Sequence, residues 1–169
     1  VCSRGCGMSA GEILRVDGID VFYGASQSLF GVSFGVEKGQ SLALLGRNGA
    51  GKSTTMKAII GIAPTKRGTV SVRGAPVQKF TPDRIARQGV GFVPEDRQIF
   101  PEHSVEDNLK IAIKPGVGGR VDWTLEKIYD VFPILASMRG RMGGRLSGGA
   151  QQMLTIARTL MGNPDVVLL

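Results

Sequence analysis

The sequence predicts an α/β fold, and three observations lead to this prediction. A glycine-rich loop at 46–53 joins a short apolar run at 41–45 to a segment with helical periodicity. Segments of strand-like composition come before this loop, and mainly helical segments follow it. The 169 residues, 42% of them hydrophobic, can bury the core of one domain. We therefore expect a core built around the loop, with an antiparallel β portion in front and a helical insert behind.

Apolar runs, caps and breakers define the individual elements. Short apolar runs predict strands, and the run at 41–45 predicts a buried one. Pro82 beside Asp83 marks a helix start, and Ser104 with Asp107 three residues later resembles a capping box. Strands are expected at 13–21, 29–36, 41–45, 68–72, 89–93 and 166–169. Helices are expected at 54–60 with Met56, Ile59 and Ile60 on one face, from Thr81, at 104–113, at 122–132 ending near Pro133, and from 147 to 162, with a loop at 114–120.

The loop at 46–53 matches the complete pattern G-x-x-x-x-G-K-[ST]. Its glycines let backbone N–H groups surround phosphate oxygens, Lys52 reaches the β- and γ-phosphates, and the Ser53 hydroxyl can bind Mg²⁺. The helix that follows places the phosphates at its N-terminus. The alternative is an ordinary glycine-rich turn between a strand and a helix. The residues concerned are Gly46, Arg47, Asn48, Gly49, Ala50, Gly51, Lys52, Ser53 and Thr54.

A second motif starts the last long helix. Ser147 can cap that helix, and the two glycines after it leave the first N–H groups open to an anion. Gly162 and Pro164 end it. Taken alone, Ser-Gly-Gly is as often an ordinary loop-to-helix junction. The motif comprises Leu146, Ser147, Gly148, Gly149, Ala150, Gln151 and Gln152, and the expected apolar face comprises Met153, Ile156, Ala157, Leu160 and Met161.

With these two motifs and the strand after Asn163, the chain resembles the ATP-binding subunit of ABC transporters from about Ile13 to Leu169. The segments at 23–26 and 93–101 are similar to the ATPases of branched-chain amino-acid uptake, with urea-type uptake ATPases as an alternative. The resemblance implies a P-loop NTPase core with an antiparallel β portion and an α-helical insert at about 104–140. The ATP-binding domain would cover 12–169 and follow a disordered tail at 1–11.

The resemblance also implies roles for single residues. Tyr23 would stack on adenine, although a strand-end tyrosine can instead pack on the core. Glu95 occupies the position where most of the family has Gln, in the loop that joins the ATP site to the helical insert and the membrane subunit; Gln98 is the candidate in a shifted register. Ser53 would bind Mg²⁺. At position 150 the family usually has Gln or Glu. The methyl group of Ala150 cannot make the hydrogen bonds of those side chains.

The implied assembly is a head-to-tail homo- or heterodimer in which the signature at 146–151 faces the partner's ATP. Permease subunits would hold it, as a peripheral protein, at the cytoplasmic face of the inner (plasma) membrane, where ATP binding and hydrolysis drive import. Non-transport ABC proteins acting on ribosomes or DNA usually have paired ATPase domains or long inserts, unlike this chain. The net charge of +7 is scattered without interleaved aromatics, so we expect no nucleic-acid partner. The transported substrate is not encoded in an ATPase subunit.

The first and last residues of the sequence also lead to predictions. In the family, the strand at 166–169 leads into an Asp-Glu pair that holds Mg²⁺ and polarises water, and a switch histidine follows; this chain ends first. Asp165 precedes the strand and cannot substitute, and His103 is expected to be a loop residue. We therefore expect the 169 residues to bind ATP without turnover, while the longer protein is an ATPase. At the start, Cys2 and Cys6 are expected to be reduced thiols in a tail without a secretory signal.

Overall fold

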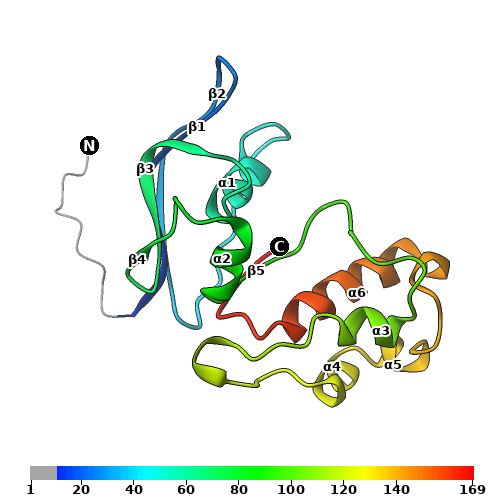
Figure 1. Ribbon diagram of the computed structural model, residues 1–169. Coiled ribbons are helices and arrows are strands. Elements are labelled where there is room, and N and C mark those ends of the chain that lie inside the picture. Colours follow the sequence, from blue (N-terminus) through cyan, green and yellow to red (C-terminus); the bar gives the residue numbers. More distant parts are fainter. Residues whose placement is uncertain (1–10) are drawn as a thin grey trace. The chain divides into compact units, whose positions relative to one another are not determined.

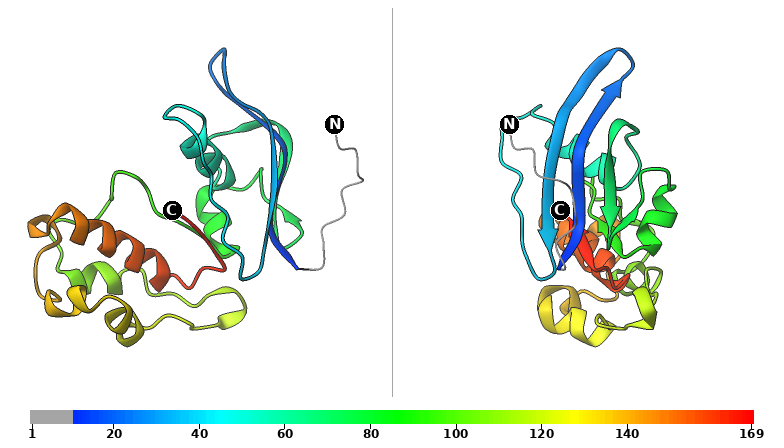
Figure 2. Two further views of the ribbon diagram at one scale, coloured as in Figure 1. Left: turned by 180° about the vertical axis from the view of Figure 1, so that it is seen from behind. Right: turned by 90° about the vertical axis from the view of Figure 1, so that its left-hand side faces the viewer.

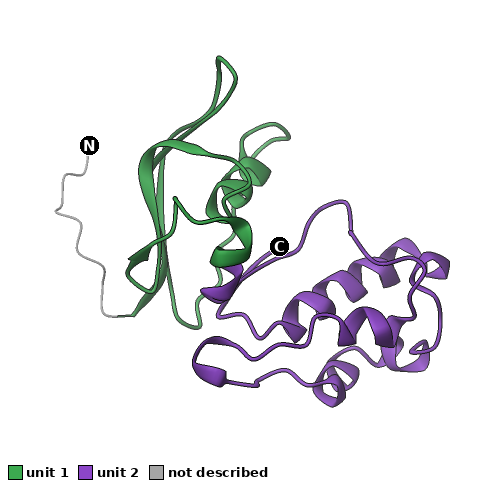
Figure 3. Cartoon of the chain, viewed as in Figure 1, with its two compact units in different colours: residues 1–85 green, residues 86–169 purple. Residues whose placement is uncertain are grey.

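The computed structural model describes residues 11–169, and the chain forms two compact units (Figure 3). The first covers residues 1–85 and the second residues 86–169. The tail predicted at 1–11 lies, except for Gly11, outside the described residues, as do both cysteines. Among the described residues, no helix has both the length and the apolar character needed to cross a membrane.

The first unit contains a four-stranded antiparallel sheet with the order β2-β1-β3-β4 (Figure 1). Alternating apolar residues fix its register: Leu14 of β1 pairs with Val36 on one side and Val72 on the other. Each of the predicted strands at 13–21, 29–36 and 68–72 is confirmed and is longer than expected. The bounds are β1 (Glu12–Tyr23), β2 (Ser26–Glu37), β3 (Thr65–Val72) and β4 (Ala75–Pro76).

Two helices follow in the chain, α1 within this unit and α2 across its last residues. Helix α1 (Lys52–Ile59) follows the glycine-rich loop as predicted, and its buried side chains are Thr55, Ala58 and Ile59. Met56, expected on the apolar face, is only partly buried. Helix α2 (Pro82–Arg87) begins at the predicted proline, with Asp83 in its first turn. Proline is tolerated there because the first helical N–H has no partner within the helix.

The prediction of a strand at 41–45 is wrong. The segment is irregular, and Leu42 and Leu45 are 46% and 91% exposed. A continuous apolar strand is stable only with neighbours on its edges and cover on both faces. The sheet of the first unit is antiparallel and does not include this segment. The apolar run alone therefore did not determine its structure.

In the second unit, a short parallel sheet is followed by helices that pack on one another. Strand β5 (Val90–Phe92) pairs with β6 (Val166–Leu168) in the register Val90 to Val166. An ion pair between Arg120 and Asp165 lies beside the start of β6. The helices are α3 (Val105–Lys110), α4 (Leu125–Val131), α5 (Pro133–Ser137) and α6 (Gly148–Met161), with short 3₁₀ turns η1 (Val117–Gly119) and η2 (Gly143–Arg145).

These helices enclose one apolar core, to which α6 contributes the largest share. The buried members are Val105, Leu109, Ile128, Leu135, Leu146, Ala150, Leu154, Ala157 and Met161. The view from behind shows α3, α4 and α5 arranged along α6 (Figure 2). The position of α6 in this core fixes where its first residues, the Ser-Gly-Gly motif, are presented.

Several helix boundaries differ from the predictions. Helix α3 ends at Lys110 and not at 113, and α4 begins at Leu125, capped by the Thr124 hydroxyl, and not at 122. Pro133 ends α4 but also opens α5, because proline suits a first helical turn. The loop predicted at 114–120 is confirmed apart from the single turn η1.

The buried face of α6 is also shifted from the predicted one. Ala157 and Met161 are buried as expected, whereas Met153, Ile156 and Leu160 are only partly buried. The buried stripe instead includes Ala150, Leu154 and the polar Thr155. The prediction followed apolar residues alone and missed a hydroxyl that finds partners inside the unit.

Candidate functional site

The glycine-rich loop has the backbone that its sequence requires. Gly49 and Gly51 have φ angles of 82° and 90°, in the region that favours glycine. A Cβ on Gly51 would lie 2.6 Å from Leu29 Cδ2 and 3.3 Å from the Ser28 carbonyl oxygen. Strand β2 therefore leaves room only for glycine at the start of α1. The loop residues before it are exposed, so a ligand can reach them.

Lys52 closes the loop on itself. Its Nζ donates to the carbonyl oxygens of Gly46 at 2.8 Å and Arg47 at 2.9 Å. These bonds hold the ammonium group across the loop, and an ammonium has three protons to donate. On the helical side, the Thr55 hydroxyl donates to the Gly51 carbonyl at 2.9 Å, and the Ser28 hydroxyl to Thr54 Oγ1 at 3.3 Å.

The residues around this loop fit a magnesium nucleotide. The first turn of α1 holds no acidic residue that would repel phosphate, and Lys52 supplies a positive charge beside the helix start. The described residues contain no group of three or more His, Cys, Asp or Glu side chains able to hold a metal alone. A magnesium ion here would be held by the Ser53 hydroxyl together with phosphate oxygens, and would neutralise phosphate charge.

Tyr23 is the last residue of β1, next to the turn that pairs it with Ser26. The residue is 52% exposed, so much of the ring is open to solvent rather than packed on the core. Such a ring can stack on a nucleotide base. The adenine contact itself remains a prediction.

The second motif forms the expected helix start. Ser147 caps α6 by accepting a hydrogen bond from the Ala150 N–H at 3.3 Å. A Cβ on Gly149 would have nothing within 4 Å, whereas one on Gly148 would lie 3.0 Å from Arg97 Nη1. Leu146 and Ala150 are buried, and the Gln151 side chain donates to the Gly143 carbonyl at 3.4 Å. Ala150 thus packs in the core of the second unit.

The segment that follows β5 carries Glu95 in an exposed turn. The turn is closed by the Arg97 N–H donating to the Pro94 carbonyl at 3.3 Å, and Arg97 has a φ of 61°. Gln98 is also exposed and donates its side-chain amide to Asp96 Oδ2 at 2.9 Å. Glu95 and Gln98 both remain candidates for the role predicted at this loop.

His103 and Asp165, for which the sequence predicted no catalytic role, lie where the sequence predicted them. His103 is an exposed loop residue whose ring lies against Phe100, with 5.8 Å between ring centroids. Asp165 precedes β6, at the end of the strand opposite to Leu168, and its carboxylate pairs with Arg120.

Two buried asparagines that organise the second unit were missed. Asn108 accepts a bond from the Phe100 N–H at 2.9 Å, and its amide donates to the carbonyls of Phe100 and Ser104, both at 2.9 Å. Asparagine is unfavourable inside a helix without such a task, and this was the available signal. Asn163 has a similar role for the loop before α4.

The Asn163 side chain holds both ends of that loop. Its Oδ1 accepts from the N–H groups of Asp122 and Trp123, both at 2.7 Å. Its Nδ2 donates to the Lys114 carbonyl at 2.9 Å. The residue is 2% exposed and has a φ of 49°, which asparagine tolerates better than most residues.

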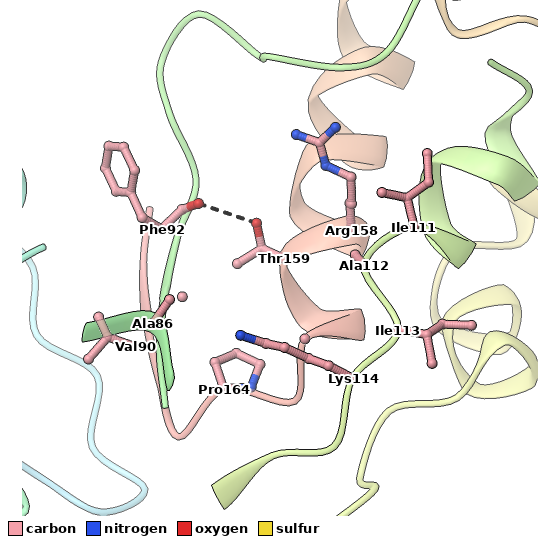
Figure 4. A pocket seen from close by; sticks show the side chains of 12 residues that line it. Ala86, Val90, Phe92, Ile111, Ala112, Ile113, Lys114, Arg158, Thr159 and Pro164 are labelled. Atoms are coloured by element: carbon pink, nitrogen blue, oxygen red, sulfur yellow. Dashed lines mark hydrogen bonds between the residues drawn. The ribbon is translucent and has the colours of Figure 1, made fainter. Parts of the chain in front are cut away.

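An open hollow of about 400 Å³ lies between β5, the 111–114 segment and the C-terminal part of α6 (Figure 4). The Thr159 hydroxyl and the Phe92 carbonyl face each other at 3.4 Å on one side. Lys114 and Arg158 are its cationic lining residues, beside apolar Ile111 and Ile113. The sequence predicted no ligand for this hollow.

The comparisons with known proteins agree with this geometry. The ABC transporter family model matches residues 29–169. The chain is 35% identical over 159 residues to the high-affinity branched-chain amino acid transport ATP-binding protein BraG of Pseudomonas aeruginosa, covering 93% of this chain and 67% of that protein. It is 38% identical to the Nod factor export ATP-binding protein I of Burkholderia orbicola, covering 87% of this chain and 48% of that protein.

A solved nucleotide-free ATP-binding cassette from an ABC transporter has a similar fold, with a TM-score of 0.74 and 30% identity. That match covers 92% of this chain and 67% of the solved chain. The chain therefore spans about two thirds or less of the length of these relatives. The family model matches most of the residues, and the structure places each of the two sequence motifs at the start of a helix. The chain therefore belongs to the ABC transporter family of ATP-binding proteins.

Proposed function

We propose that this chain is the nucleotide-binding part of an ABC importer that couples ATP binding and hydrolysis to uptake, with branched-chain amino acids as the substrate class. The observation that carries the proposal is the loop that Lys52 closes at the start of α1, on a chain that also carries a capped signature helix. The similarity to a branched-chain amino acid transport protein supports the substrate class. A urea-type or other ABC system is the alternative.

In the proposed reaction, the Lys52 ammonium donates hydrogen bonds to phosphate oxygens in place of the Gly46 and Arg47 carbonyls. The N–H groups of the loop and of the first turn of α1 orient the triphosphate. Bound Mg²⁺ supplies charge neutralisation at the phosphates, and the Ser53 hydroxyl would hold it. The exposed Tyr23 ring would limit the position of the base.

We propose that the signature acts in a head-to-tail dimer, homo- or heteromeric. There, Ser147 and the first N–H groups of α6 would bind the partner's nucleotide, because a helix N-terminus attracts anions. Gly149 has open space around its Cα, so a phosphate group can approach the backbone closely. Permease subunits would be the further partners and would place the protein at the cytoplasmic face of the plasma membrane.

A second candidate function is nucleotide binding without turnover by the 169 residues alone. The observation that favours it is the position of Asp165 at the start of β6, away from the end where the family's Asp-Glu pair is expected. Without a carboxylate to orient water, the phosphate loop binds but does not promote attack on the γ-phosphate. The test needs a lengthened form, in which the chain continues past Leu169 through the Asp-Glu segment and the switch histidine of a branched-chain relative.

Calorimetric titration with Mg-ATP tests the nucleotide site, and 8-azido-ATP labelling followed by peptide mapping tests the base contact. We expect saturable binding and a label on the peptide that contains Tyr23. Absence of binding by the folded protein would contradict the proposal. Leucine uptake by membranes reconstituted with the lengthened form and its permease, compared with urea uptake, decides the substrate class.

A further inference from the structure

Polar side chains on one face of α6 fasten the segment that follows β5. Thr155 and Arg158 lie one turn apart on the helix. The Thr155 hydroxyl donates to the Arg97 carbonyl, and Arg158 Nη2 donates to the Gln98 carbonyl. Thr155 is fully buried, so its hydroxyl depends on protein partners. All of these residues belong to the second unit.

The direction of the Thr155 hydrogen bond follows from its distances. The hydroxyl oxygen lies 2.5 Å from the Arg97 carbonyl oxygen and 2.9 Å from the Gln151 carbonyl oxygen of its own helix. A hydroxyl has one proton to donate, and the Arg97 carbonyl oxygen is the nearer of its two acceptors. Thr155 therefore donates to Arg97.

Thr159, one turn further along α6, shows the opposite preference. Its hydroxyl oxygen lies 3.0 Å from the Thr155 carbonyl within the helix and 3.4 Å from the Phe92 carbonyl. Figure 4 shows this longer contact at the edge of the hollow. Thr159 thus bonds mainly to its own helix, which makes it a matched comparison for Thr155.

Further contacts hold the same segment. The Arg97 guanidinium lies against Gly148, where an added Cβ would be 3.0 Å from Nη1 and 3.4 Å from Cζ. The Arg158 guanidinium lies 4.9 Å from the Phe100 ring centroid, and Asn108 binds both the N–H and the carbonyl of Phe100. The backbone is therefore anchored directly after Glu95.

We propose that Thr155 and Arg158 are positioning residues that fix the spacing between Glu95 and the start of the signature at Ser147. This inference rests on the proposed ATPase function. Glu95 precedes the anchored Arg97 by two positions, so its Cα can lie at most about 7 Å from that of Arg97. A loop held in this way need not be ordered anew at each nucleotide-binding event, which would cost conformational entropy.

The structural arm of the test compares Thr155→Val, Thr155→Ser and Thr159→Val by amide hydrogen exchange. Valine keeps the shape of Thr155 but leaves the Arg97 carbonyl without its donor. We expect exchange of the Arg97 and Gln98 amides to become about three- to tenfold faster, because one hydrogen bond is lost. Thr155→Ser and the control Thr159→Val should exchange like the wild type.

The functional arm measures ATP turnover by the lengthened form. Thr155→Val should lower kcat about three- to tenfold, the same factor as the exchange effect, with KM for ATP within about twofold of the wild type. The phosphate loop lies in the other unit and keeps its residues, so initial nucleotide affinity should persist. Thr155→Ser should restore kcat, and Arg158→Lys, which loses the planar guanidinium, should also lower it.

The outcomes separate this inference from the proposed function. Unchanged amide exchange in Thr155→Val, or faster exchange with normal kcat, would overturn the positioning role while ATP hydrolysis stands. If the wild-type lengthened form neither binds nor hydrolyses Mg-ATP, the proposed function fails and the reaction role falls with it. The exchange difference between valine and serine would survive that second result.

Discussion

The Lys52 ammonium lies 2.8 Å from the Gly46 carbonyl oxygen, so the cation of the phosphate loop is bonded to the first residue of the same loop. A phosphate group that binds here must replace or share these bonds. The affinity for nucleotide is therefore a difference between two sets of charge-assisted hydrogen bonds, each worth roughly 1.5–3 kcal/mol. This relationship makes Lys52 the first residue to change.

Lys52→Ala should weaken Mg-ATP binding about tenfold or more, because the charge-assisted bonds to phosphate are lost. Isothermal titration calorimetry measures this directly. Lys57→Ala is the matched control, since Lys57 is an exposed lysine in the last turn of the same helix. Equal affinities of Lys52→Ala and Lys57→Ala would count against the phosphate-loop assignment.

The 169-residue chain should bind ATP and release no phosphate above background, whereas the lengthened form should hydrolyse ATP. The reason is the position of Asp165 at the start of β6, since phosphoryl transfer to water needs a positioned nucleophile and the family's carboxylates are expected at the other end of that strand. A coupled phosphate-release assay measures both proteins. Steady release by the 169 residues that disappears with Lys52→Ala would show that a carboxylate beyond Leu169 is not needed.

Gly149→Asp in the lengthened form should abolish ATP-driven dimerisation and leave monomer binding almost unchanged. Open space surrounds Gly149, so aspartate fits without disturbing the fold, but its charge would oppose a partner's phosphate. At about 4 Å and an effective dielectric of about 20, the repulsion is about 4 kcal/mol.

Size-exclusion chromatography with ATP, on a background that binds but does not hydrolyse, checks the Gly149→Asp prediction. Gly140→Asp is the control, because a Cβ at Gly140 also has nothing within 4 Å and lies outside the signature. Dimerisation of Gly149→Asp to the same extent as Gly140→Asp would mean that the signature does not face the nucleotide.

Tyr129→Phe should stabilise the second unit by about 1 kcal/mol at neutral pH. The Tyr129 hydroxyl is buried without a hydrogen-bond partner among the described residues, and phenylalanine removes that unsatisfied group. Urea unfolding measures the difference. Tyr23→Phe serves as the control, because Tyr23 is half exposed and its hydroxyl can bind water.

The same substitution should change the pH dependence of stability. Burial raises the pKa of Tyr129, the Glu106 charge adds to this effect, and Arg139 and Lys110 oppose it. Because this pKa is raised in the folded protein, the contribution of Tyr129 to stability is fully present below its ordinary pKa of 10.0. That contribution is lost as the pH rises through the pKa of the folded state. The advantage of Tyr129→Phe should therefore grow above about pH 10, and a constant difference would contradict it.

Local signals predicted the ends of α6 well, because caps act within a few residues. Ser147 and Gly162 stand at its two boundaries as expected. The buried face was harder to predict, because Thr155 is buried through bonds to Arg97, a residue 58 positions away in the chain. No periodicity of apolar residues contains that information.

The same distinction explains the error at 41–45. Apolar content predicted a buried strand, but strand formation depends on neighbours that a local window does not contain. The strand pairs β1–β2 and β5–β6 were predicted as elements, whereas their registers became visible only in the structure. For the candidate site, the motif residues were found from spacing, but the anchoring roles of Asn108 and Asn163 depend on distant carbonyls.

Because one buried side chain, Asn163, binds both Lys114 and Trp123, the residues between them form a loop whose two ends are held together. This loop contains Gly118 and Gly119, which are both exposed and would have no neighbours within 4 Å of an added Cβ. We therefore expect the loop to tolerate extra residues at these two glycines. It is also a suitable place to insert an epitope or a fluorescent reporter that keeps the hydrogen bonds of Asn163.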